Sequence, residues 1–511
     1  MSIEPSFSAF EPAHRLGQSQ VVWTRLVDDL ETPVSAYLKL GQGRTHAFLF
    51  ESVEGGAYRG RHSVITLEPD LIWRCRDGQA EIAEGNDIAD GRYRKVAGGV
   101  LDSLRDLVAA ARMDLPRGIP RMAGGLFGTI GYDMIRLVER LPQVNPDPLG
   151  LPDAIMVRPS IVAIFDGISQ EIILVTTVRP EGQSAGDAYD AACGRLNRIV
   201  EELRTRQLPQ RASEPAVFDG EFQSPISREG YWEIVERAKR YVEAGDVFQV
   251  VPSHRFRAPF EQDPFALYRS LRRINPSPYL FYLNFGDFQL VGSSPEILVQ
   301  LRDGKITIRP IAGTRRRGET PEEDLALEAE LRSDPKEHAE HLMLLDLGRN
   351  DVGRVAMLGQ KGRNEPASQR KSANVRVTDS FFVERYSHVM HLVSNVEGDA
   401  PEGIDPVDVL MAALPAGTLS GAPKVRAMQI IDELEIEKRG VAFAGAVGYF
   451  GADGSVDTCI VLRTGLVKDG MLYVQAGGGV VADSDPDAEF LETVQKSMAL
   501  RKAAEEAWRF A

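Results

Sequence analysis

Cysteine is scarce in this chain: among 511 residues only Cys75, Cys193 and Cys459 occur, and no two of them form a CxxC pair. Their wide spacing excludes a disulfide framework and a cysteine-based zinc site, and it is typical of free thiols in a reducing compartment. The chain does not begin with a basic stretch followed by an apolar one, so no secretory signal is expected. No apolar run approaches the ~18–20 residues that cross a bilayer. These absences predict a cytoplasmic protein without a membrane partner.

Positive charge is also in deficit, since 59 lysines and arginines stand against 74 aspartates and glutamates, for a formal net charge of −15. This balance argues against nucleic acid as a partner and against binding to an anionic membrane. If the ligand is itself an anion, its site must hold local positive charge. A metal ion or a few placed arginine and lysine side chains would supply it.

Strand-like segments recur along the whole chain and are separated by helical ones. Asp-Gly pairs, which favour hairpin turns, occur at 77–78, 303–304, 453–454 and 469–470. Apolar residues at helical spacing predict a helix at about 187–206, and a second helix is expected at 227–244 with Ser227 as its cap. Together these patterns predict an α+β fold of layered antiparallel sheets flanked by helices.

The length of the chain favours two packed domains rather than one. Residues 211–226 are polar, contain prolines and show no apolar periodicity. Such a segment is typical of a linker. We therefore expect an N-terminal region at 1–210 packed on a C-terminal domain at 227–511.

Two of the expected helices start in the same acidic way. Each opens with Asp-Pro, at 334–335 and at 485–486, which suits the N-cap and the first helical position. Two glutamates follow at a spacing of three in each helix: Glu337 and Glu340, then Glu489 and Glu492. Either pair alone could complete a capping box or face solvent.

Taken together, the four carboxylates favour a metal site. If they converge, they repel by several kcal/mol at an effective dielectric constant of about 20, and a hard cation such as Mg²⁺ removes that cost. A di-iron centre is not favoured, because such centres use Glu-x-x-His pairs that neither helix offers. Solvated helix faces remain the alternative.

Three further features could serve an anionic ligand. Gly477, Gly478 and Gly479 follow an apolar strand, so their backbone N–H groups could face an anion, although a tight strand-to-helix turn explains them as well. Arg463 is a cation in an apolar strand-like segment, where arginine more often has an anionic partner. His391 lies alone in an apolar stretch and fits a core position more readily than a catalytic one. None of these features names a reaction.

Several longer segments, read together, resemble the chorismate-utilising enzyme family across essentially all of 227–500. They occur in the family's order, at 245–253 (GDVFQVVPS), 275–279 (NPSPY), 292–296 (GSSPE), 310–314 (PIAGT), 334–351 (DPKEHAEHLMLLDLGRND), 415–424 (PAGTLSGAPK), 457–464 (DTCIVLRT) and 475–496. Residues of about 20–180, best at 48–52 (FLFES), resemble more loosely the N-terminal region of the anthranilate synthase large subunits.

This resemblance implies a metal cofactor and a set of substrate contacts. Glu340 and Glu492 would bind Mg²⁺ with Glu337 and Glu489 behind them, and the metal would neutralise the ring carboxylate of chorismate. The residues implied at the substrate are Gly313, Thr314, Phe443, Arg463, Gly477, Gly478, Gly479 and Lys496. Phe443 stands where the family usually has a tyrosine, so the hydroxyl contact of that tyrosine is missing or comes from elsewhere.

The resemblance also implies the reaction. Glu296 matches the acid that protonates the leaving C4 hydroxyl, and Thr418 adds a hydrogen-bond donor. Gln249 stands where the isochorismate and salicylate synthases have a lysine base that activates water, and Ala312 stands where aminodeoxychorismate synthases often have a nucleophilic lysine. Ammonia needs neither residue, so anthranilate synthase chemistry is implied, with His391 as the proton-transfer partner. An aminodeoxychorismate synthase or an inactive tryptophan-binding paralogue is the alternative.

Two partners follow from the same resemblance. The chain has no GxCxG-type nucleophile, so a separate glutamine amidotransferase subunit would supply the ammonia. Tryptophan would act as a feedback inhibitor in a pocket formed where the two regions meet. The residues implied there are Glu51, Ser52, Pro278, Tyr279 and Leu280.

Overall fold

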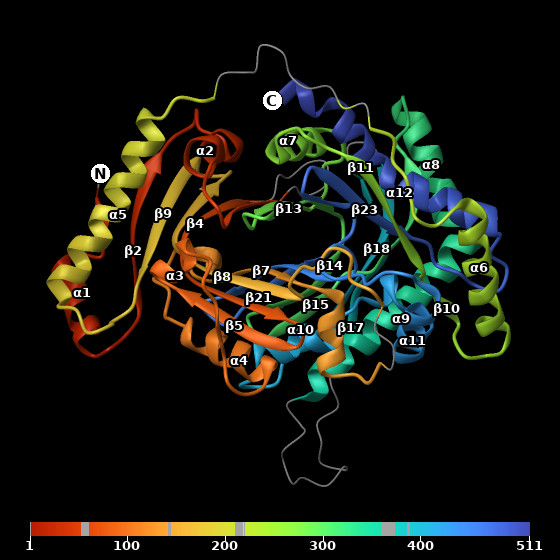
Figure 1. Cartoon of the computed structure of the whole chain (residues 1–511), viewed down its shortest axis with the longest axis horizontal. Helices are drawn as coiled ribbons and strands as arrows, with labels where there is room; N and C mark the ends of the chain where they lie inside the picture. Colours follow the sequence, from red (N-terminus) through yellow and green to blue (C-terminus); the bar gives the residue numbers. More distant parts are fainter. Residues whose placement is uncertain are drawn as a thin grey trace, which may run out of the picture.

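The computed structural model describes residues 2–52, 61–141, 145–209, 218, 220–358, 374–385 and 389–510. Within that part, 21 strands form one hydrogen-bonded network that is flanked by helices, and a further two-stranded sheet lies beside it (Figure 1). Neighbouring strands pair in antiparallel fashion, as in the pairs β4–β8 and β11–β23. The predicted α+β class is therefore confirmed.

The elements of the first half alternate strands with short helices. The strands are β1 (Ile3–Glu4), β2 (Gln20–Val27), β3 (Ala47–Ser52), β4 (His62–Arg76), β5 (Gln79–Glu84), β6 (Arg94–Lys95), β7 (Gly125–Ile130), β8 (Ala154–Asp166) and β9 (Glu171–Val178). The helices are α1 (Phe7–Arg15), α2 (Pro33–Leu40), α3 (Asn86–Ala89), α4 (Val100–Ala110) and α5 (Ala185–Thr205), with the 3₁₀ turns η1 (Arg121–Ala123) and η2 (Tyr132–Leu137).

The second half adds longer helices. Its strands are β10 (Gln249–Val250), β11 (Ser253–Pro259), β12 (Tyr279–Asn284), β13 (Phe288–Ser294), β14 (Ile297–Arg302), β15 (Lys305–Ile308), β16 (Ile311–Arg316), β17 (Arg376–Arg385), β18 (Val389–Asp399), β19 (Gly421–Ala422), β20 (Ala446–Gly451), β21 (Val456–Ile460), β22 (Thr464–Lys468) and β23 (Met471–Gly477). Its helices are α6 (Arg228–Glu243), α7 (Pro264–Ile274), α8 (Pro321–Ser333), α9 (Pro335–Leu358), α10 (Pro406–Ala413), α11 (Lys424–Leu434) and α12 (Pro486–Glu506), with the 3₁₀ turns η4 (Gly417–Leu419) and η5 (Ala507–Phe510).

Local sequence signals account for many of these boundaries. The two helices expected at about 187–206 and 227–244 are α5 and α6, and the Ser227 hydroxyl accepts the Gly230 N–H at the start of α6. The Asp-Gly pairs at 77–78, 303–304 and 469–470 have positive φ at both residues, as a two-residue hairpin requires. The pair at 453–454 differs, because only Gly454 has a positive φ and four residues separate β20 from β21.

Strands from the two halves of the chain pair directly. β3 lies against β12, and β7 lies against β20, so segments that are far apart in sequence share one sheet. Most of 211–226 lies outside the described residues. The division into a region at 1–210 and a domain at 227–511 therefore stays a prediction.

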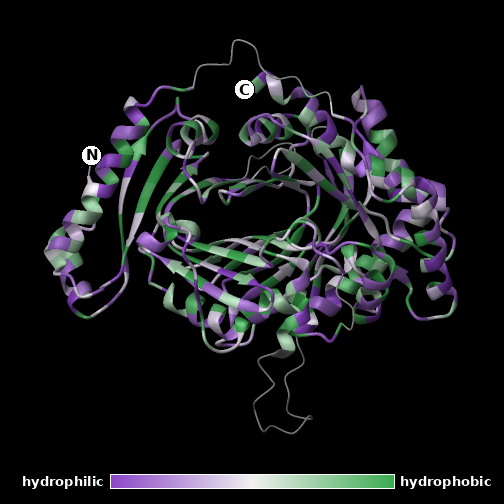
Figure 2. Cartoon of the chain, in the orientation of Figure 1, coloured by the Kyte–Doolittle hydropathy of each residue, from purple (hydrophilic) through white to green (hydrophobic). Residues whose placement is uncertain are grey.

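The core is likewise shared between distant segments. One large buried cluster contains Leu196 of α5, Leu267 of α7 and Leu500 of α12. Figure 2 shows hydrophobic residues concentrated along the strands and more hydrophilic ones on the outer helices. Cys75 and Cys459 are buried free thiols, and Cys193 is a half-buried one. No helix in the described ranges has the length and apolar character needed to span a bilayer.

Candidate functional site

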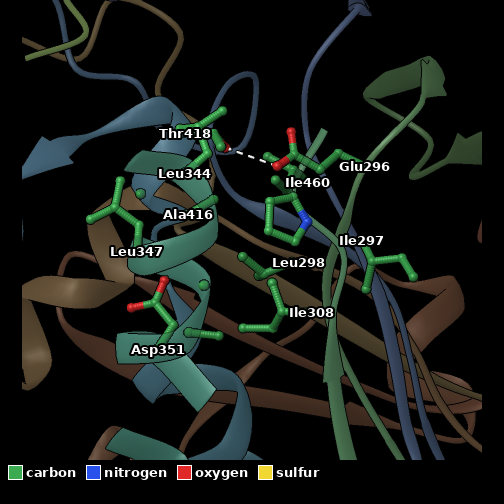
Figure 3. Close-up of a pocket in the computed structure, with 14 residues that line it drawn as sticks. Glu296, Ile297, Leu298, Ile308, Leu344, Leu347, Asp351, Ala416, Thr418 and Ile460 are labelled. Atoms are coloured by element: carbon green, nitrogen blue, oxygen red, sulfur yellow. Dashed lines mark hydrogen bonds between the residues drawn. The ribbon is translucent and has the colours of Figure 1, made fainter. Parts of the chain in front are cut away.

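Glu296 lies between β13 and β14 and is almost completely buried, with 9% of its surface exposed. The Thr418 hydroxyl, in η4, donates to its Oε1 atom over 3.2 Å (Figure 3). Burial raises the pKa of Glu296 to about 8, although the Thr418 hydrogen bond and the positive charges of Arg463 and Lys496 oppose the shift. The carboxyl group is therefore mostly protonated at neutral pH and can serve as an acid.

A narrow pocket runs from Glu296 and Thr418 between α9 and β14 (Figure 3). Its walls are mainly apolar, which explains why the charged form of Glu296 is disfavoured; they include Leu298, Ile308, Leu344, Leu347, Ala416 and Ile460. Asp351 lines the same pocket and forms a buried ion pair of 2.7 Å with Lys424. Neither member of this pair was singled out from the sequence, although each ends a segment that resembles the family.

His391, in β18, lies opposite Thr314 of β16 in the strand register. Its Nδ1 atom is 3.2 Å from the Gly313 carbonyl oxygen and 3.0 Å from the Thr314 hydroxyl. Because a carbonyl oxygen can only accept, we assign the ring proton to Nδ1, which leaves the lone pair on Nε2. Burial, aided by Arg463, lowers the pKa of His391 to about 4, so the ring is neutral at pH 7 and can accept a proton.

A bulge at Gly313 aims the carbonyl group that orients His391. The β16–β18 register shifts between Ala312 and Thr314, and Gly313 has a φ of +63°. A Cβ atom there would lie 2.9 Å from Leu331 and 3.0 Å from a carboxylate oxygen of Glu337. Only glycine fits both the backbone conformation and the space.

Arg463 does not lie within a strand, contrary to the sequence interpretation. β21 ends at Ile460 and β22 begins at Thr464, so Arg463 belongs to the short connection between them. Its φ of +48° is unusual for a residue other than glycine and costs about 1–3 kcal/mol. Its positive charge lowers the pKa of both Glu296 and His391, which places the guanidinium near the two groups.

The three consecutive glycines form a closely packed turn after β23. A Cβ atom would lie 2.6 Å from the Pro252 carbonyl oxygen at Gly477, 2.6 Å from Glu489 at Gly478, and 2.3 Å from Gln249 at Gly479. The Gly478 N–H donates to the Pro252 carbonyl group over 3.3 Å. Lys496 donates to the Gly477 carbonyl group over 3.0 Å. The turn thus brings Gln249 of β10 together with Glu489 and Lys496 of α12.

Gln249 is buried in this arrangement, with 5% of its surface exposed. Its side-chain oxygen has no hydrogen-bond partner among the described residues. β10, which carries Gln249, pairs with β19 close to Thr418. Gln249 lies opposite Ala422, four residues after Thr418.

The four glutamates remain two separate pairs. Asp334 and Asp485 cap their helices as predicted, by accepting the N–H groups of Glu337 and Ala488. Within the described ranges, however, no group of three or more histidine, cysteine, aspartate or glutamate side chains is placed to hold a metal ion. The expected convergence is therefore not seen in this arrangement.

Local partners explain the separation of the glutamate pairs. Glu337 binds Arg315 over 2.9 Å, and Glu492 binds Lys496 over 2.6 Å. Glu489 accepts a hydrogen bond from Ser484 over 2.7 Å, and Glu340 is exposed on α9. Each of the bound carboxylates finds a neighbouring donor, which reduces the repulsion that a metal ion was expected to relieve.

Phe443 is buried among core residues. Its ring packs with Tyr132 and Met428, and the Arg439 guanidinium lies 5.3 Å from the ring centre. This environment is a sufficient packing reason for the residue. Its expected contact with a substrate stays a prediction.

The five residues implied at the inhibitor pocket meet where β3 pairs with β12. Ser52 lies opposite Tyr279, and Glu51 lies opposite Leu280, with Pro278 just before the strand. Side chains alternate along a strand, so Glu51 and Leu280 face one side of the sheet while Ser52 and Tyr279 face the other. The structure therefore places these side chains on two faces of the sheet, and a pocket formed by all five stays a prediction.

Glu51 is also already paired. Its carboxylate accepts two hydrogen bonds from Arg272, at 2.7 and 2.9 Å, and one from the Tyr268 hydroxyl at 2.5 Å, and Leu280 is 1% exposed. On the opposite face, Gln300 donates to the half-buried Tyr279 hydroxyl over 2.8 Å. Ser52 and Tyr279 are half-buried, whereas Glu51 and Leu280 are buried.

Comparison with known proteins places this geometry in context. Residues 68–502 match the family described as chorismate binding enzyme. An anthranilate synthase component 1 from Cereibacter sphaeroides is 55% identical over 510 residues, covering 99% of this chain and 98% of that protein. The protein of the same name from Pseudomonas putida is 46% identical over 486 residues, covering 93% of each.

Solved structures agree with the sequence matches. The crystal structure of anthranilate synthase component I from Streptococcus pneumoniae is 35% identical and superimposes with a TM-score of 0.74, covering 93% of this chain and 98% of that one. MenF, the menaquinone-specific isochorismate synthase of Escherichia coli, is 18% identical with a TM-score of 0.68, covering 97% and 99% of the two chains. The second likeness shows a shared fold alone.

Proposed function

The chain belongs to the chorismate-binding enzyme family, within its anthranilate synthase component 1 group, and on that basis we propose that it converts chorismate and ammonia into anthranilate, pyruvate and water. The observation that carries the chemistry is the buried, protonated carboxyl group of Glu296, with Arg463 and Lys496 near it. Positive charge at this one place suits a dianionic substrate on a protein whose net charge is −15.

The first step is amination. Ammonia adds to C2 of the chorismate ring, the ring double bonds shift, and the C4 hydroxyl leaves. A hydroxyl leaves poorly unless it is protonated, so Glu296 donates its proton and water departs. The added nitrogen then releases one proton, which restores the charge balance and returns Glu296 to its acid form.

The second step removes pyruvate from the aminated ring. His391 accepts the proton from C2 through Nε2, the released electron pair forms the aromatic ring, and the C3–O bond breaks. The enolate that leaves takes up that proton on carbon and becomes pyruvate, which returns His391 to its neutral form. The neutral ring with its proton held at Nδ1 suits this role.

Two neutral residues favour ammonia over other nucleophiles. Gln249 is a poor base, so it does not activate water as a lysine would, and Ala312 offers no side-chain nucleophile to attack the ring. Ammonia needs no base to attack carbon. The same residues argue against isochorismate and aminodeoxychorismate synthesis.

We also propose Mg²⁺ as the cofactor. Glu340 and Glu492, with Glu337 and Glu489 behind them, offer the hard oxygen ligands that Mg²⁺ prefers, on two capped helix starts. Binding requires Glu337 and Glu492 to exchange their present cationic partners for the metal. When bound, Mg²⁺ would neutralise a substrate carboxylate and help to orient it.

A partner subunit and feedback control complete the proposal. A chain named component 1 implies a second component, and we propose a glutamine amidotransferase that delivers ammonia. We propose tryptophan as the inhibitor, bound beside Ser52 and Tyr279 at the β3–β12 pair, with Pro278 adjacent. A ligand there can inhibit only if it binds one arrangement of the two strands better than another.

The test uses the purified chain with chorismate, MgCl₂ and either an ammonium salt or glutamine, with anthranilate fluorescence as the readout. We expect product with ammonium at elevated pH, where more free NH₃ is present, and none with glutamine. The Glu296→Gln variant is the control. Glutamine-dependent product from this chain alone would reveal a glutaminase site, and an amino product that retains the pyruvyl group would indicate an aminodeoxychorismate synthase.

A further inference from the structure

A cavity of about 560 Å³ lies in the N-terminal half, among β4, β8, β9 and the first turns of α5. Figure 1 places β4, β9 and α5 on the left, whereas β18 and α12 of the proposed catalytic site are on the right. Sites for small molecules typically measure about 300–1,000 Å³, so this space exceeds what a few water molecules need. None of the residues assigned above to catalysis, metal or inhibitor lines it.

The inner wall of the cavity is cationic. Arg158 and Arg179 each donate to the single carboxylate of Asp70, at 2.5 and 2.9 Å, and Arg195 donates to the Thr176 hydroxyl at 2.9 Å. A bulge in β4 between Pro69 and Leu71 turns Asp70 toward these arginines. Three guanidinium groups against one carboxylate leave an excess of two positive charges.

The remaining acidic side chains of the lining are exposed. Glu84 and Glu181 lie at the rim in contact with solvent, and Glu84 is bonded to Arg94 over 2.6 Å. Their charges are screened by water, whereas the arginines lie deeper. The excess positive charge of the inner wall is therefore not cancelled at the rim.

Arg179 is the residue that most clearly indicates a ligand-binding site in this cavity. Only 10% of its side chain is exposed, and two of its nitrogen atoms, Nε and Nη2, have no hydrogen-bond partner among the described residues. These two N–H groups lie along the same edge of the guanidinium plane, the edge that binds two oxygens of one oxyanion at once. A buried donor without a partner is costly, so a ligand that supplies two oxygens would relieve the cost.

Burial disfavours the charged arginines further. It lowers the pKa of Arg179 to about 10, against the opposing charges of Asp70 and Glu181 and with a contribution from Arg158. Burial also lowers the pKa of Arg195, although Glu68 and Asp70 oppose the shift. Both side chains are charged at pH 7, and the carboxylates around them offset only part of the cost of their burial. A dianion would offset the rest.

We propose that this cavity binds the phosphate group of a small molecule, with Arg179 holding two of its oxygens and Arg158 and Arg195 balancing its charge. A phosphate monoester carries close to two negative charges at neutral pH, which matches the excess of the inner wall. The Ser160 and Thr177 side chains and the Gln183 amide also line the cavity and offer further donors. The site does not depend on the proposed catalytic function.

The experiment follows thermal unfolding of the full chain with inorganic phosphate or glycerol 3-phosphate, against sodium chloride at the same ionic strength. We expect phosphate and the monoester to raise the melting temperature of the wild type beyond the chloride control. A stronger effect of the monoester would identify an organic phosphate as the ligand, and an equal effect would identify free phosphate. No excess stabilisation by either would overturn the proposal.

Matched variants locate the effect. Arg179→Gln and Arg195→Gln should weaken phosphate binding about tenfold or more, because each removes a positive charge and Arg179→Gln also removes two charge-assisted hydrogen bonds. Arg198→Gln, on the same helix but outside the cavity lining, should bind as the wild type does. Equal binding by all three variants would contradict the assignment.

A second pair of variants serves if the arginine variants do not fold. Ser160→Asp places a fixed carboxylate in the cavity, so it should abolish the phosphate effect while the melting temperature without phosphate is kept or raised. Ser160→Asn has a similar size but no charge, and it should retain the effect. Retained phosphate stabilisation in Ser160→Asp would overturn the proposal.

Discussion

At the scale of single residues, burial shifts the pKa values of Glu296 and His391 in opposite directions, and both groups become neutral as a result. It raises the pKa of the carboxyl group to about 8 and lowers the pKa of the imidazole to about 4. Each group is therefore neutral at pH 7, so the first can give a proton and the second can take one. One environment thus prepares an acid and a base for successive steps.

The pH dependence of turnover should report Glu296. Because the protonated form is active, the rate at fixed free NH₃ should fall as pH rises through about 8. Thr418→Val removes a hydrogen bond that lowers this pKa, so the fall should move to higher pH. Glu296→Gln should lack the transition and lose about 100- to 10,000-fold in rate. An unshifted profile in Thr418→Val would separate Thr418 from the acid.

Replacement of His391 should divide the two steps of the reaction. In His391→Ala, pyruvate elimination should slow more than amination, so chromatography should show an aminated, still pyruvyl-bearing intermediate. Thr314→Val removes only the hydroxyl beside Nδ1 and should cost about fivefold, the worth of one hydrogen bond. Equal loss of both steps without an intermediate would leave His391 with a structural role.

At the scale of elements, the first turns of α9 and α12 carry the carboxylates proposed to bind Mg²⁺. Both turns keep their capping aspartates, so a change of one glutamate leaves the helix start intact. Arg315 already pairs with Glu337, and Lys496 pairs with Glu492 within α12, so both cations compete with a metal ion for these carboxylates. Metal binding is thus coupled to a change of partner at both helix starts.

Glu340→Gln and Glu492→Gln should abolish turnover and weaken Mg²⁺ binding measured by calorimetry, while circular dichroism stays unchanged. Glu330→Gln is the matched control, because Glu330 of α8 also binds Arg315 but is not among the proposed ligands. It should keep both activity and Mg²⁺ affinity. Near-full activity of either ligand variant at low Mg²⁺ would make the metal assignment wrong.

At the scale of the whole molecule, the β3–β12 pair joins strands from the two halves of the chain. A ligand bound beside Ser52 and Tyr279 touches both halves, so it can favour one relative arrangement of the strands. The buried pairing of Glu51 with Arg272 and Tyr268 holds the other face of the same junction. We therefore expect changes on the Ser52 face to alter inhibition and changes on the Glu51 face to alter stability.

Tryptophan inhibition curves and melting temperatures should distinguish variants on the two faces of the β3–β12 pair. Ser52→Ala should raise the inhibitory concentration about fivefold without a change in melting temperature, since it removes one hydrogen bond. Glu51→Ala should lower the melting temperature, because it leaves the buried Tyr268 hydroxyl without its acceptor, whereas Glu51→Gln should restore part of that loss. An unchanged curve in Ser52→Ala would exclude this location for the inhibitor.

Local structure was predictable wherever a few neighbouring residues decide it. The caps at Ser227, Asp334 and Asp485 are where the sequence indicated, and three of the four Asp-Gly pairs expected at hairpins form that turn. Capping and hairpin turns depend on hydrogen bonds and φ values within about four residues, so no distant contact is needed to specify them.

The environment of each site residue was decided only by the tertiary structure. The pKa of Glu296, the pairing of Glu51 and the separation of the four glutamates all depend on strands and helices that are far apart in sequence. So do the two Arg179 donors that have no partner among the described residues. Side chains become buried, or come close to other charges, only when such elements pack together. Alternation along a strand shows which side chains share a face of the sheet, but it does not show whether that face packs in the core or meets a ligand. Residue type and local spacing therefore determined which side chains could do chemistry here, and packing determined which of them are protonated, paired or open to a ligand.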